Sequence, residues 1–348
     1  MGSIDHTGLP EALILGAVHH ATDVLDRLQR AYTVHVLASG VTRASFFADC
    51  AAGRYDNVVA IGRSVDSVTL TGRFDPELVH RLPPSVRFVC HNGAGYDQVD
   101  VAACRARGIA VSNTPDVVNA ATADTTLLLI LAALRRARIP QAAILEGQWA
   151  QPGVRLPLGR DPVGLTLGIV GLGGIGVAVA HRAAAFGMQV QYHNRRRAAD
   201  AFLSNKGVRV TYVPTLAQLL RTSDVVSVHV PLSDATHHLI GAAEFAQMKA
   251  GVVFVNTARG PVVDEAALVD ALESGHVWSA GLDVFENEPH VHPGLLRNEN
   301  TVLLPHIGTA TKETRQAMEA LMLENVESGL ARGQLKTPVP ECREMESN

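Results

Sequence analysis

Short runs of apolar residues alternate with amphipathic stretches along most of this chain. In the first third, the runs EALILGAV, TVHVLAS, NVVAIG, VRFVCHN and IAVSNT have the length and composition of buried strands. Between them lie stretches such as HATDVLDRLQRAY, which carry apolar residues on one helical face. Strands that alternate with helices are typical of a parallel sheet covered by helices, so the pattern predicts an α/β fold.

The pattern changes in the middle of the chain. We expect Pro140 to end a long helical run, NAATADTTLLLILAALRRAR. The Pro- and Gly-containing segment that follows, QWAQPGVRLPLGRDPVG, is predicted to be a loop or an extended arm. From residue 164 onward, further strands are predicted at GLTLGIVG, MQVQYH, VRVTYV, VVSVHVP, GVVFVNTA, WSAGLDVF and TVLLPH. These predict a doubly wound parallel sheet, after which the helical stretch TKETRQAMEALMLENVESGLARG ends the fold.

Composition narrows the class of protein. The chain has 348 residues, which suggests two domains, and it is 47% hydrophobic, which is enough for real cores. A net charge of −4 gives no general attraction to nucleic acid or to an anionic membrane. The longest apolar run, LLLILAAL, is too short to span a bilayer, and MGSIDHTGLP does not look like a signal peptide. Because the four cysteines lie far apart, we expect reduced thiols in a cytoplasmic protein.

A glycine-rich turn follows the strand at residues 164–171. Gly171, Gly173 and Gly176 form the pattern GxGxxG between a strand and a helix. In this context the first glycine allows a tight turn, the second lets backbone approach a pyrophosphate, and the third lets the helix pack close to the strand. The helix N-terminus then offers free N–H groups to phosphates. The sequence therefore predicts a dinucleotide site, the alternative being a tight turn without a ligand.

The end of the next strand lacks the acidic residue that usually binds the ribose 2′-hydroxyl of NAD. His193 and Asn194 stand there, followed by Arg195, Arg196 and Arg197. A guanidinium group matches the oxygens of a 2′-phosphate, so Arg195 or Arg196 is predicted to accept NADP. The alternative is a solvated basic turn.

Three later strands end in polar residues. Arg259 follows VVFVNTA, Asp283 and Glu288 follow WSAGL, and His306 ends TVLLPH. Because ligands of open α/β sheets bind at the carboxyl ends of strands, we expect these side chains to converge. Imidazole suits proton transfer, a nearby carboxylate favours the imidazolium, and Arg binds a carboxylate with two donors. The pattern predicts hydride transfer between a nicotinamide and a 2-hydroxy acid; taken singly, each residue could be structural.

The remaining histidines stand mostly in pairs without further ligands at metal spacing. We interpret them as surface or local hydrogen-bonding residues and predict no metal site. The pairs are His19 with His20, His237 with His238, and His290 with His292.

Taken together, these motifs resemble the D-2-hydroxyacid dehydrogenase family. The resemblance covers nearly the whole chain and rests on HNGAGYDQVD, GIVGLGGIG, HVPL, VNTARG, GLDVFENEP and LLPHIGT in family order. It implies two Rossmann-like α/β domains, with a dinucleotide-binding domain at 119–309 inserted into a substrate domain formed by 1–118 and 310–348. It also implies a homodimer formed through the helix and arm at 119–165.

The resemblance further implies residue roles. His306 is similar to the family's general acid and base, Glu288 to its partner, and Arg259 to the cation that binds substrate. Backbone N–H groups of the loop Asn92, Gly93, Ala94 and Gly95 would hold the substrate carboxylate, and Asp283 the nicotinamide carboxamide. With the glycine loop and the arginine turn, the predicted contacts to NAD or NADP are Gly171, Gly173, Gly174, Ile175, Gly176, Asn194, Arg195, Arg196, Val230, Pro231, Thr236, Thr257, Ala258, Arg259, Asp283, His306 and Gly308.

Within the family, the chain is most similar to the fungal D-mandelate dehydrogenase type and to glyoxylate/hydroxypyruvate reductases. The resemblance implies D-mandelate, or phenylglyoxylate in the reductive direction, as the substrate, with a glyoxylate/hydroxypyruvate reductase as the alternative. His193 stands where many members have Asp, and no regulatory domain is expected after the core. A formate dehydrogenase is a weaker match, because that type has Gln at the position of Glu288. A corepressor-like protein that senses NAD(H) keeps similar motifs and stays open as an alternative. The substrate pocket is expected near residues 61–65 and the HNGAGY loop.

Overall fold

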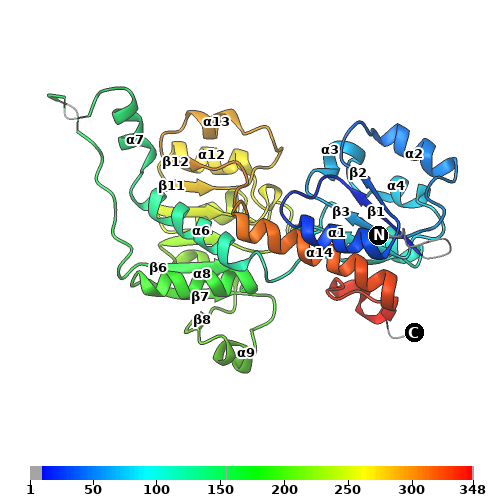
Figure 1. The fold of residues 1–348 in the computed structure, drawn as a ribbon. Coiled ribbons are helices and arrows are strands. Elements are labelled where there is room, and N and C mark those ends of the chain that lie inside the picture. Colours follow the sequence, from blue (N-terminus) through cyan, green and yellow to red (C-terminus); the bar gives the residue numbers. More distant parts are fainter. Residues whose placement is uncertain (1–9, 150, 154, 347–348) are drawn as a thin grey trace. The chain divides into compact units, whose positions relative to one another are not determined.

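The structure, a computed structural model, describes residues 10–149, 151–153 and 155–346. The chain divides into two compact units, Met1–Val118 with Thr311–Asn348, and Asn119–Ala310 (Figure 1). Each unit is built on one parallel sheet with helices around it, of five strands in the first unit and seven in the second. This confirms the predicted fold class of two Rossmann-like α/β domains.

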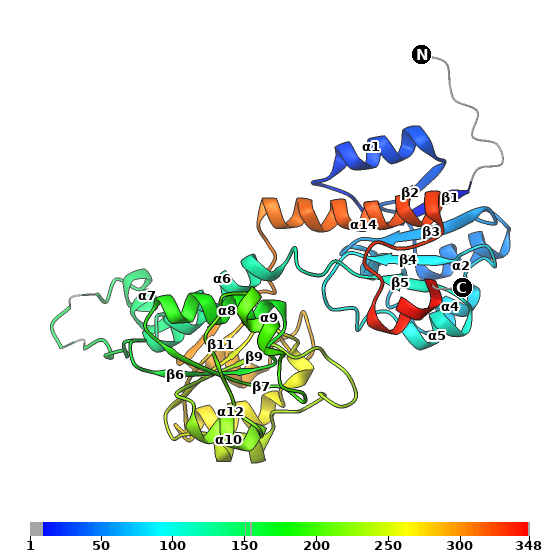
Figure 2. The same ribbon diagram turned by 90° about the horizontal axis from the view of Figure 1, so that it is seen from below.

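The first unit has the strand order β2-β1-β3-β4-β5. Figure 2 shows α1 and α14 along one side of this sheet, with α4 and α5 on the other. The strands are β1 (Glu11–Leu15), β2 (Val34–Leu37), β3 (Val58–Arg63), β4 (Phe88–His91) and β5 (Ala110–Ser112). The helices are α1 (Thr22–Ala31), α2 (Arg43–Ala51), α3 (Ser67–Thr71), α4 (Pro76–Arg81), α5 (Val101–Ala106), α14 (Lys312–Arg332) and the 3₁₀ helix η2 (Pro340–Glu346).

The second unit has the strand order β12-β11-β10-β9-β6-β7-β8. The chain winds outward from β6 in both directions, so the order reverses beside this strand. The strands are β6 (Thr166–Val170), β7 (Gln189–His193), β8 (Thr211–Tyr212), β9 (Val225–Val228), β10 (Val252–Asn256), β11 (Val277–Leu282) and β12 (Thr301–Leu303). The helices are α6 (Asn119–Leu134), α7 (Arg138–Leu145), α8 (Gly174–Ala185), α9 (Asp200–Asn205), α10 (Leu216–Thr222), α11 (Ala242–Gln247), α12 (Glu265–Glu273), α13 (Pro293–Arg297) and the 3₁₀ helix η1 (Gly260–Val262).

Both faces of this second sheet are buried, which explains the continuous apolar strands. Successive side chains of a strand point to opposite faces. Accordingly, Val253 and Val255 of β10 join a core with α6 and α8, whereas Val252 and Phe254 join a core with α10, α11 and α12. A parallel sheet covered in this way leaves its strand ends as the place for polar side chains.

The long helical run differs from the prediction. Helix α6 ends at Leu134, before Pro140, and Arg136 adopts a left-handed φ of 47° in the connection to α7. Pro140 lies in the first turn of α7, where its missing N–H removes no helical hydrogen bond. Proline therefore belongs to the start of a second helix here and does not end the first. The arm predicted at 148–164 contains no helix or strand among its described residues.

The four cysteines are buried free thiols. Burial raises the pKa of Cys90 and of Cys104 to about 12, so neither is a ready nucleophile. Among the described residues, no helix is long and apolar enough to cross a membrane.

Candidate active site

The glycine loop joins β6 to α8 and leaves room beside its backbone. Gly171 has a φ of 101°, and a side chain there would meet the backbone of His229 at 2.9 Å. A side chain on Gly176 would meet the carbonyl of Gly171 at 2.6 Å, whereas one on Gly173 would enter open space. Gly173 is the N-cap of α8 and supplies no side-chain cap, so the first-turn amides of this helix suit phosphate oxygens. These features fit a bound dinucleotide pyrophosphate.

The end of β7 holds the loop and carries the arginines. The Asn194 side chain accepts a hydrogen bond from the Leu172 amide at 2.6 Å, which ties the second strand to the glycine turn. His193 Nδ1 is 3.0 Å from the Val213 carbonyl, so His193 serves the backbone of the sheet edge. Arg195 and Arg196 follow as exposed side chains. The predicted 2′-phosphate ligands are therefore accessible to a cofactor.

His306 and Glu288 are hydrogen-bonded to each other. His306 Nδ1 lies 2.9 Å from Glu288 Oε2, and the other carboxylate oxygen accepts from the Phe285 amide at 3.0 Å. Burial raises the pKa of Glu288, but the hydrogen bond and charge of His306 and the charge of Arg259 outweigh this and bring it below its usual range. Glu288 is therefore a carboxylate at working pH, and it orients the imidazole with Nε2 left for another partner.

Asp283 fixes the backbone that directly follows His306. This residue follows β11 and is 1% exposed, and its two oxygens accept from the amides of Ile307 and Gly308, each at 2.7 Å. Burial raises the pKa of Asp283, although both hydrogen bonds lower it. His306 itself has a φ of 54°, an unfavourable value for a non-glycine residue. Asp283 thus holds the conformation that directs the imidazole.

Arg259 is placed by a turn after β10. The buried Asn256 side chain accepts from the Ala258 amide at 3.0 Å and donates to the Arg259 carbonyl at 2.9 Å. The next residue, Gly260, packs so closely on the Phe285 backbone that a Cβ would lie 1.9 Å from it. This close approach brings the Arg259 turn against the loop of Glu288, which is why Arg259 lowers the pKa of that carboxyl group.

The other predicted cofactor residues line the same strand ends. Thr257 is buried and shares a 2.8 Å hydrogen bond with Thr126 of α6. The Thr236 hydroxyl donates to the Pro231 carbonyl at 2.6 Å and so closes the turn that begins after Val230.

The loop predicted to hold the substrate carboxylate lies in the first unit, after β4. Three of its four carbonyls have hydrogen-bond partners: Gly93 accepts from the Thr114 amide at 3.0 Å, Ala94 from the Asn113 side chain at 2.7 Å, and Gly95 is 3.0 Å from His91 Nε2. Within the described part of the chain, the Ala94 and Gly95 amides form no hydrogen bond. Backbone donors without acceptors are what a carboxylate needs.

A cavity of about 210 Å³ adjoins this loop within the first unit. Its walls are formed by the segment after β1, the segment after β3 and the start of α14. Of the predicted pocket residues, Ser64, Val65 and Asn92 line it. Most of the lining residues have polar side chains. The lining residues are Ala17, His19, His20, Ser64, Val65, Asp66, Asn92, Arg315 and Glu319.

The histidine pairs form local hydrogen bonds. The amides of His19 and His20 donate to Glu319 of α14, at 3.1 and 2.6 Å. His292 Nδ1 accepts from the Gly294 amide at the start of α13. Of the His19 and His20 side chains, His19 Nε2 lies 3.3 Å from Asp66 Oδ2.

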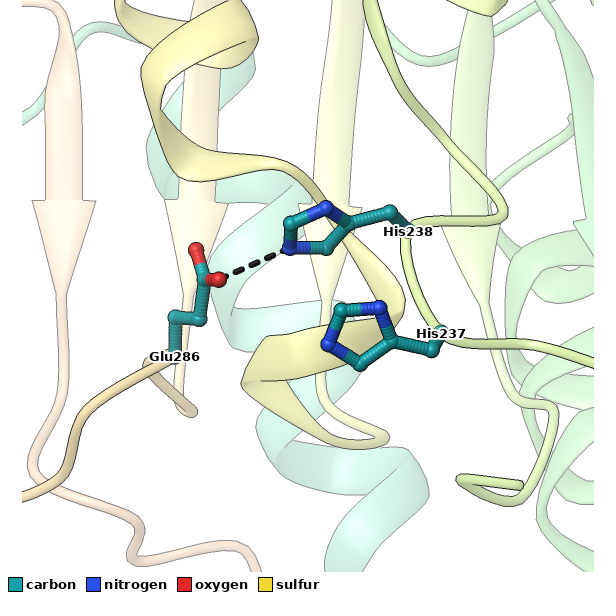
Figure 3. Close-up of side chains that lie close together, drawn as sticks. All are labelled: His237, His238 and Glu286. Carbon is teal, nitrogen blue, oxygen red and sulfur yellow. Dashed lines mark hydrogen bonds and ion pairs between the residues drawn. The ribbon is translucent and has the colours of Figure 1, made fainter. Parts of the chain in front are cut away.

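One group of side chains in the described ranges comes close to metal-binding geometry. The ligand atoms of His237, His238 and Glu286 lie within 4.8 Å of one another, and His238 Nε2 is 2.7 Å from Glu286 (Figure 3). The two rings stack at 4.1 Å with an angle of 27° between their planes. What the structure shows in this group is the hydrogen bond between His238 and Glu286.

Comparison with known proteins gives the family. The sequence profile described as "D-isomer specific 2-hydroxyacid dehydrogenase, NAD binding domain" matches residues 127–308, more than half of the chain. The chain belongs to the D-isomer specific 2-hydroxyacid dehydrogenase family. It is therefore an oxidoreductase with NAD or NADP as cofactor, and the resemblance drawn from the motifs is confirmed.

Relatives within this family support the assignment over the full length. The chain is 49% identical to 4-methyl-2-oxopentanoate reductase A of Aspergillus oryzae, over 96% of this chain and 98% of the relative. Crystal structures of a glyoxylate reductase from Paecilomyes thermophila and of the holo D-mandelate dehydrogenase from Rhodotorula graminis are similar, at 49% and 35% identity with TM-scores of 0.91 and 0.87. They cover 96% and 95% of this chain, and the chain covers 99% and 98% of them. The NADPH-dependent glyoxylate/hydroxypyruvate reductase of Sinorhizobium meliloti, solved with NADP and malonate, is 36% identical over 95% of this chain and 97% of its own, with a TM-score of 0.81.

Two contacts of this D-2-hydroxyacid dehydrogenase were not predicted. Asp283 is predicted to contact the cofactor, but in the structure its side chain accepts hydrogen bonds from the two amides after His306. Asn256, which shapes the Arg259 turn, is not among the predicted residues. A polar residue at the end of an otherwise apolar strand, as in VVFVN, is the signal that points to Asn256.

Proposed function

We propose that the protein reduces a small 2-oxoacid to the D-2-hydroxyacid, with His306 as proton donor, Glu288 as its partner and Arg259 as the substrate cation. The observation that carries the proposal is the 2.9 Å pairing of His306 with Glu288, with Arg259 close enough to act on the same carboxylate. An imidazolium held in this way suits proton transfer to a carbonyl oxygen.

In this mechanism the nicotinamide, when bound, supplies the hydride that adds to C2. His306 Nε2 gives its proton to the carbonyl oxygen, and Glu288 stabilises the imidazolium before that transfer. Arg259 binds the carboxylate and polarises the carbonyl through its two-donor guanidinium. In the first unit, the amides of Ala94 and Gly95 are proposed donors for a substrate carboxylate. In the opposite direction, neutral His306 accepts the hydroxyl proton.

The cavity beside Asn92 favours a polar substrate side chain. Most of the residues that line it, Asn92 and Ser64 among them, carry polar side chains. Polar side chains suit a ligand hydroxyl better than a phenyl ring. We therefore propose hydroxypyruvate as the preferred substrate, glyoxylate as a smaller alternative, and phenylglyoxylate, the oxidised form of D-mandelate, as a poorer one.

The cofactor preference follows from the end of β7. His193 and Asn194 carry no carboxylate that would repel a 2′-phosphate, and the exposed Arg195 and Arg196 offer it charged donors. We propose that NADPH is used, and that NADH also works because the glycine loop serves both cofactors.

One set of rates tests the proposed function. The absorbance of the reduced nicotinamide is followed with NADPH and with NADH, against hydroxypyruvate, glyoxylate, phenylglyoxylate and 4-methyl-2-oxopentanoate. We expect kcat/KM to be highest for hydroxypyruvate with NADPH. No turnover of any 2-oxoacid would contradict the enzyme and favour the cofactor-sensing alternative, and a preference for phenylglyoxylate would contradict the polar pocket.

We also propose a homodimer formed through α6, α7 and the following arm. Helix α7 and the arm extend away from the sheet of their unit (Figure 1), and the whole segment carries exposed large apolar side chains, an arrangement that favours a partner surface. They include Leu128, Ile144, Leu145, Trp149, Leu158 and Val163. Light scattering during size-exclusion chromatography should give about twice the 37.0 kDa of one chain. The four reduced thiols suit the cytoplasm, where we propose the protein works.

A further inference from the structure

Arg63 is a fully buried arginine at the end of β3 whose presence packing does not explain. It is 0% exposed, and its guanidinium lies over the Phe74 ring at 5.3 Å. Burial lowers the pKa of Arg63 to about 10, so the group still carries its charge at neutral pH. Its Nε is buried without a hydrogen-bond partner in the described structure, a cost that an apolar residue would avoid. The role of Arg63 must therefore lie in the contacts of its two terminal guanidinium nitrogens.

Those nitrogens contact Gln98 and His91. One donates to the Gln98 side chain at 2.9 Å, and the other lies 3.1 Å from His91 Nδ1. A guanidinium has donors and no acceptor, so His91 Nδ1 must be the acceptor in this pair. The proton of the neutral imidazole is consequently on Nε2, which lies 3.0 Å from the Gly95 carbonyl and donates to it. Arg63 thus selects the form of His91 that can hold Gly95.

The loop after β4 is wrapped around this imidazole. A Cβ on Gly93 would lie 2.6 Å from His91 Nε2, so the backbone passes directly over the ring. The Asn92 amide donates to the Arg63 carbonyl at 2.9 Å, which joins the loop to β3 as well. The Gly95 carbonyl is bound to His91, whereas the amides of Ala94 and Gly95 form no hydrogen bond in the described part of the chain.

We propose that Arg63, acting through His91, is a positioning residue that fixes the Ala94 and Gly95 amides for the substrate carboxylate. The inference rests on the proposed function, because it needs a carboxylate substrate at this loop. It predicts that breaking the Arg63–His91–Gly95 chain weakens substrate binding while cofactor binding, which uses the glycine loop of the other unit, is unchanged.

Two substitutions of His91 separate its two hydrogen bonds. In His91→Asn the amide reaches only as far as Nδ1, so it can still accept from Arg63 but cannot reach the Gly95 carbonyl. In His91→Gln the amide reaches as far as Nε2 and can still donate to Gly95. Glyoxylate is the substrate of choice because it has no side chain beyond C2. We expect KM for glyoxylate to rise about tenfold in His91→Asn, with a smaller change in kcat, and to stay within about threefold in His91→Gln.

Arg63→Met should raise KM as His91→Asn does, and Arg107→Met is the matched control. Arg107 also donates to carbonyls of the same unit, at Leu82 and Pro83, but does not contact the loop. Arg107→Met should therefore lower thermal stability without changing KM for glyoxylate. The dissociation constant of NADPH, measured by fluorescence, should be the same in all variants. In addition, the ¹H–¹⁵N spectrum of the wild-type imidazoles should show His91 protonated on Nε2 only, assigned by its loss in His91→Gln.

The outcomes are distinct. If the wild type is active but His91→Asn and Arg63→Met keep the wild-type KM, or if His91 carries its proton on Nδ1, the positioning role is wrong and the proposed function stands. A fall in NADPH affinity equal to the rise in KM would also overturn it, because that would be general damage. If the wild type reduces no 2-oxoacid, the proposed function fails and this inference fails with it.

Discussion

Replacing Glu288 with Gln tests the proposed proton relay between Glu288 and His306. In the protein, one oxygen of Glu288 accepts from the Phe285 amide and the other is paired with His306 Nδ1. A glutamine that keeps its oxygen on Phe285 must turn its NH₂ group toward His306. The imidazole would then have to accept at Nδ1, so the imidazolium required for reduction would lose its partner and meet a donor instead.

The expected magnitude follows from the geometry and the exposure of the pair. Two unit charges about 4 Å apart attract by about 1 kcal/mol in water and about 4 kcal/mol at an effective dielectric constant of 20. The His306 and Glu288 side chains are 46% and 37% exposed, so solvent screening places the lost attraction at about 1–3 kcal/mol. At about 1.4 kcal/mol per tenfold, losing this attraction should lower the reductive kcat/KM by about 5- to 150-fold.

The assay is the pH profile of kcat/KM in both directions of the reaction. The pKa of Glu288 lies below its usual range, so the wild-type carboxylate stays ionised from mildly acidic pH upward and supports the imidazolium throughout. In Glu288→Gln the fall of the reductive rate on the alkaline side should move about 1–2 units toward acid, because the imidazolium persists only at lower pH. Oxidation, which needs neutral imidazole, should lose less at neutral pH. Glu286→Gln is the control, since that carboxylate pairs with His238 in the same loop. Profiles of Glu288→Gln and wild type that superimpose would refute the relay.

Four further substitutions have expected outcomes. His306→Ala should lower kcat by about 10² or more with little change in the dissociation constant of NADPH, and near-normal turnover would remove it from the mechanism. Arg259→Lys keeps the charge but loses the two-donor geometry, so kcat/KM should fall by about tenfold or more, and a lysine as good as arginine would refute bidentate binding. The double variant Arg195→Ala with Arg196→Ala should lower kcat/KM for NADPH relative to NADH by about 1–3 kcal/mol, equivalent to about 5- to 150-fold; an unchanged ratio would make these arginines a solvated turn. Asp283→Ala removes two buried acceptors, so we expect about 1–3 kcal/mol lower stability by urea denaturation and a reduced kcat, and a variant as stable as wild type would contradict its role.

The convergence of the proposed catalytic residues could be predicted from the sequence because it depends on where strands end. Arg259 follows β10, Glu288 follows β11 and His306 follows β12, and these three strands are neighbours in the sheet. Parallel neighbours end on the same edge, so polar residues after each strand meet there whatever the loops between them. What the residues alone could not supply is the strand order, because apolar runs of similar composition carry no code for which pairs with which.

The contacts that fix the site were beyond prediction for a different reason. Asp283 reaches amides 24 and 25 residues away, and Arg63 reaches an imidazole 28 residues away. Such pairs depend on the register and the turn geometry of two segments at once, which one-dimensional patterns do not contain. Pro140 shows the same limit locally. A proline can follow the end of one helix or stand in the first turn of another. Here the left-handed Arg136 separates α6 from α7, so Pro140 stands in the first turn of α7.

In both units, a side chain at the end of a buried strand holds the backbone of the turn that follows. The residue that ends a buried strand sends its side chain back to hold the turn that follows, as Asn256 does after β10 and His91 does after β4. His306 shows why the turn must be held: its left-handed backbone is unfavourable on its own and persists because Asp283 binds the next two amides. A carboxylate buried to 1% exposure is costly unless it is fully hydrogen-bonded, so the stability of Asp283 and the geometry of His306 depend on the same two bonds. Loss of either hydrogen bond should therefore lower both turnover and the stability of the fold. Loss of Glu288, which is more exposed than Asp283, should lower mainly turnover.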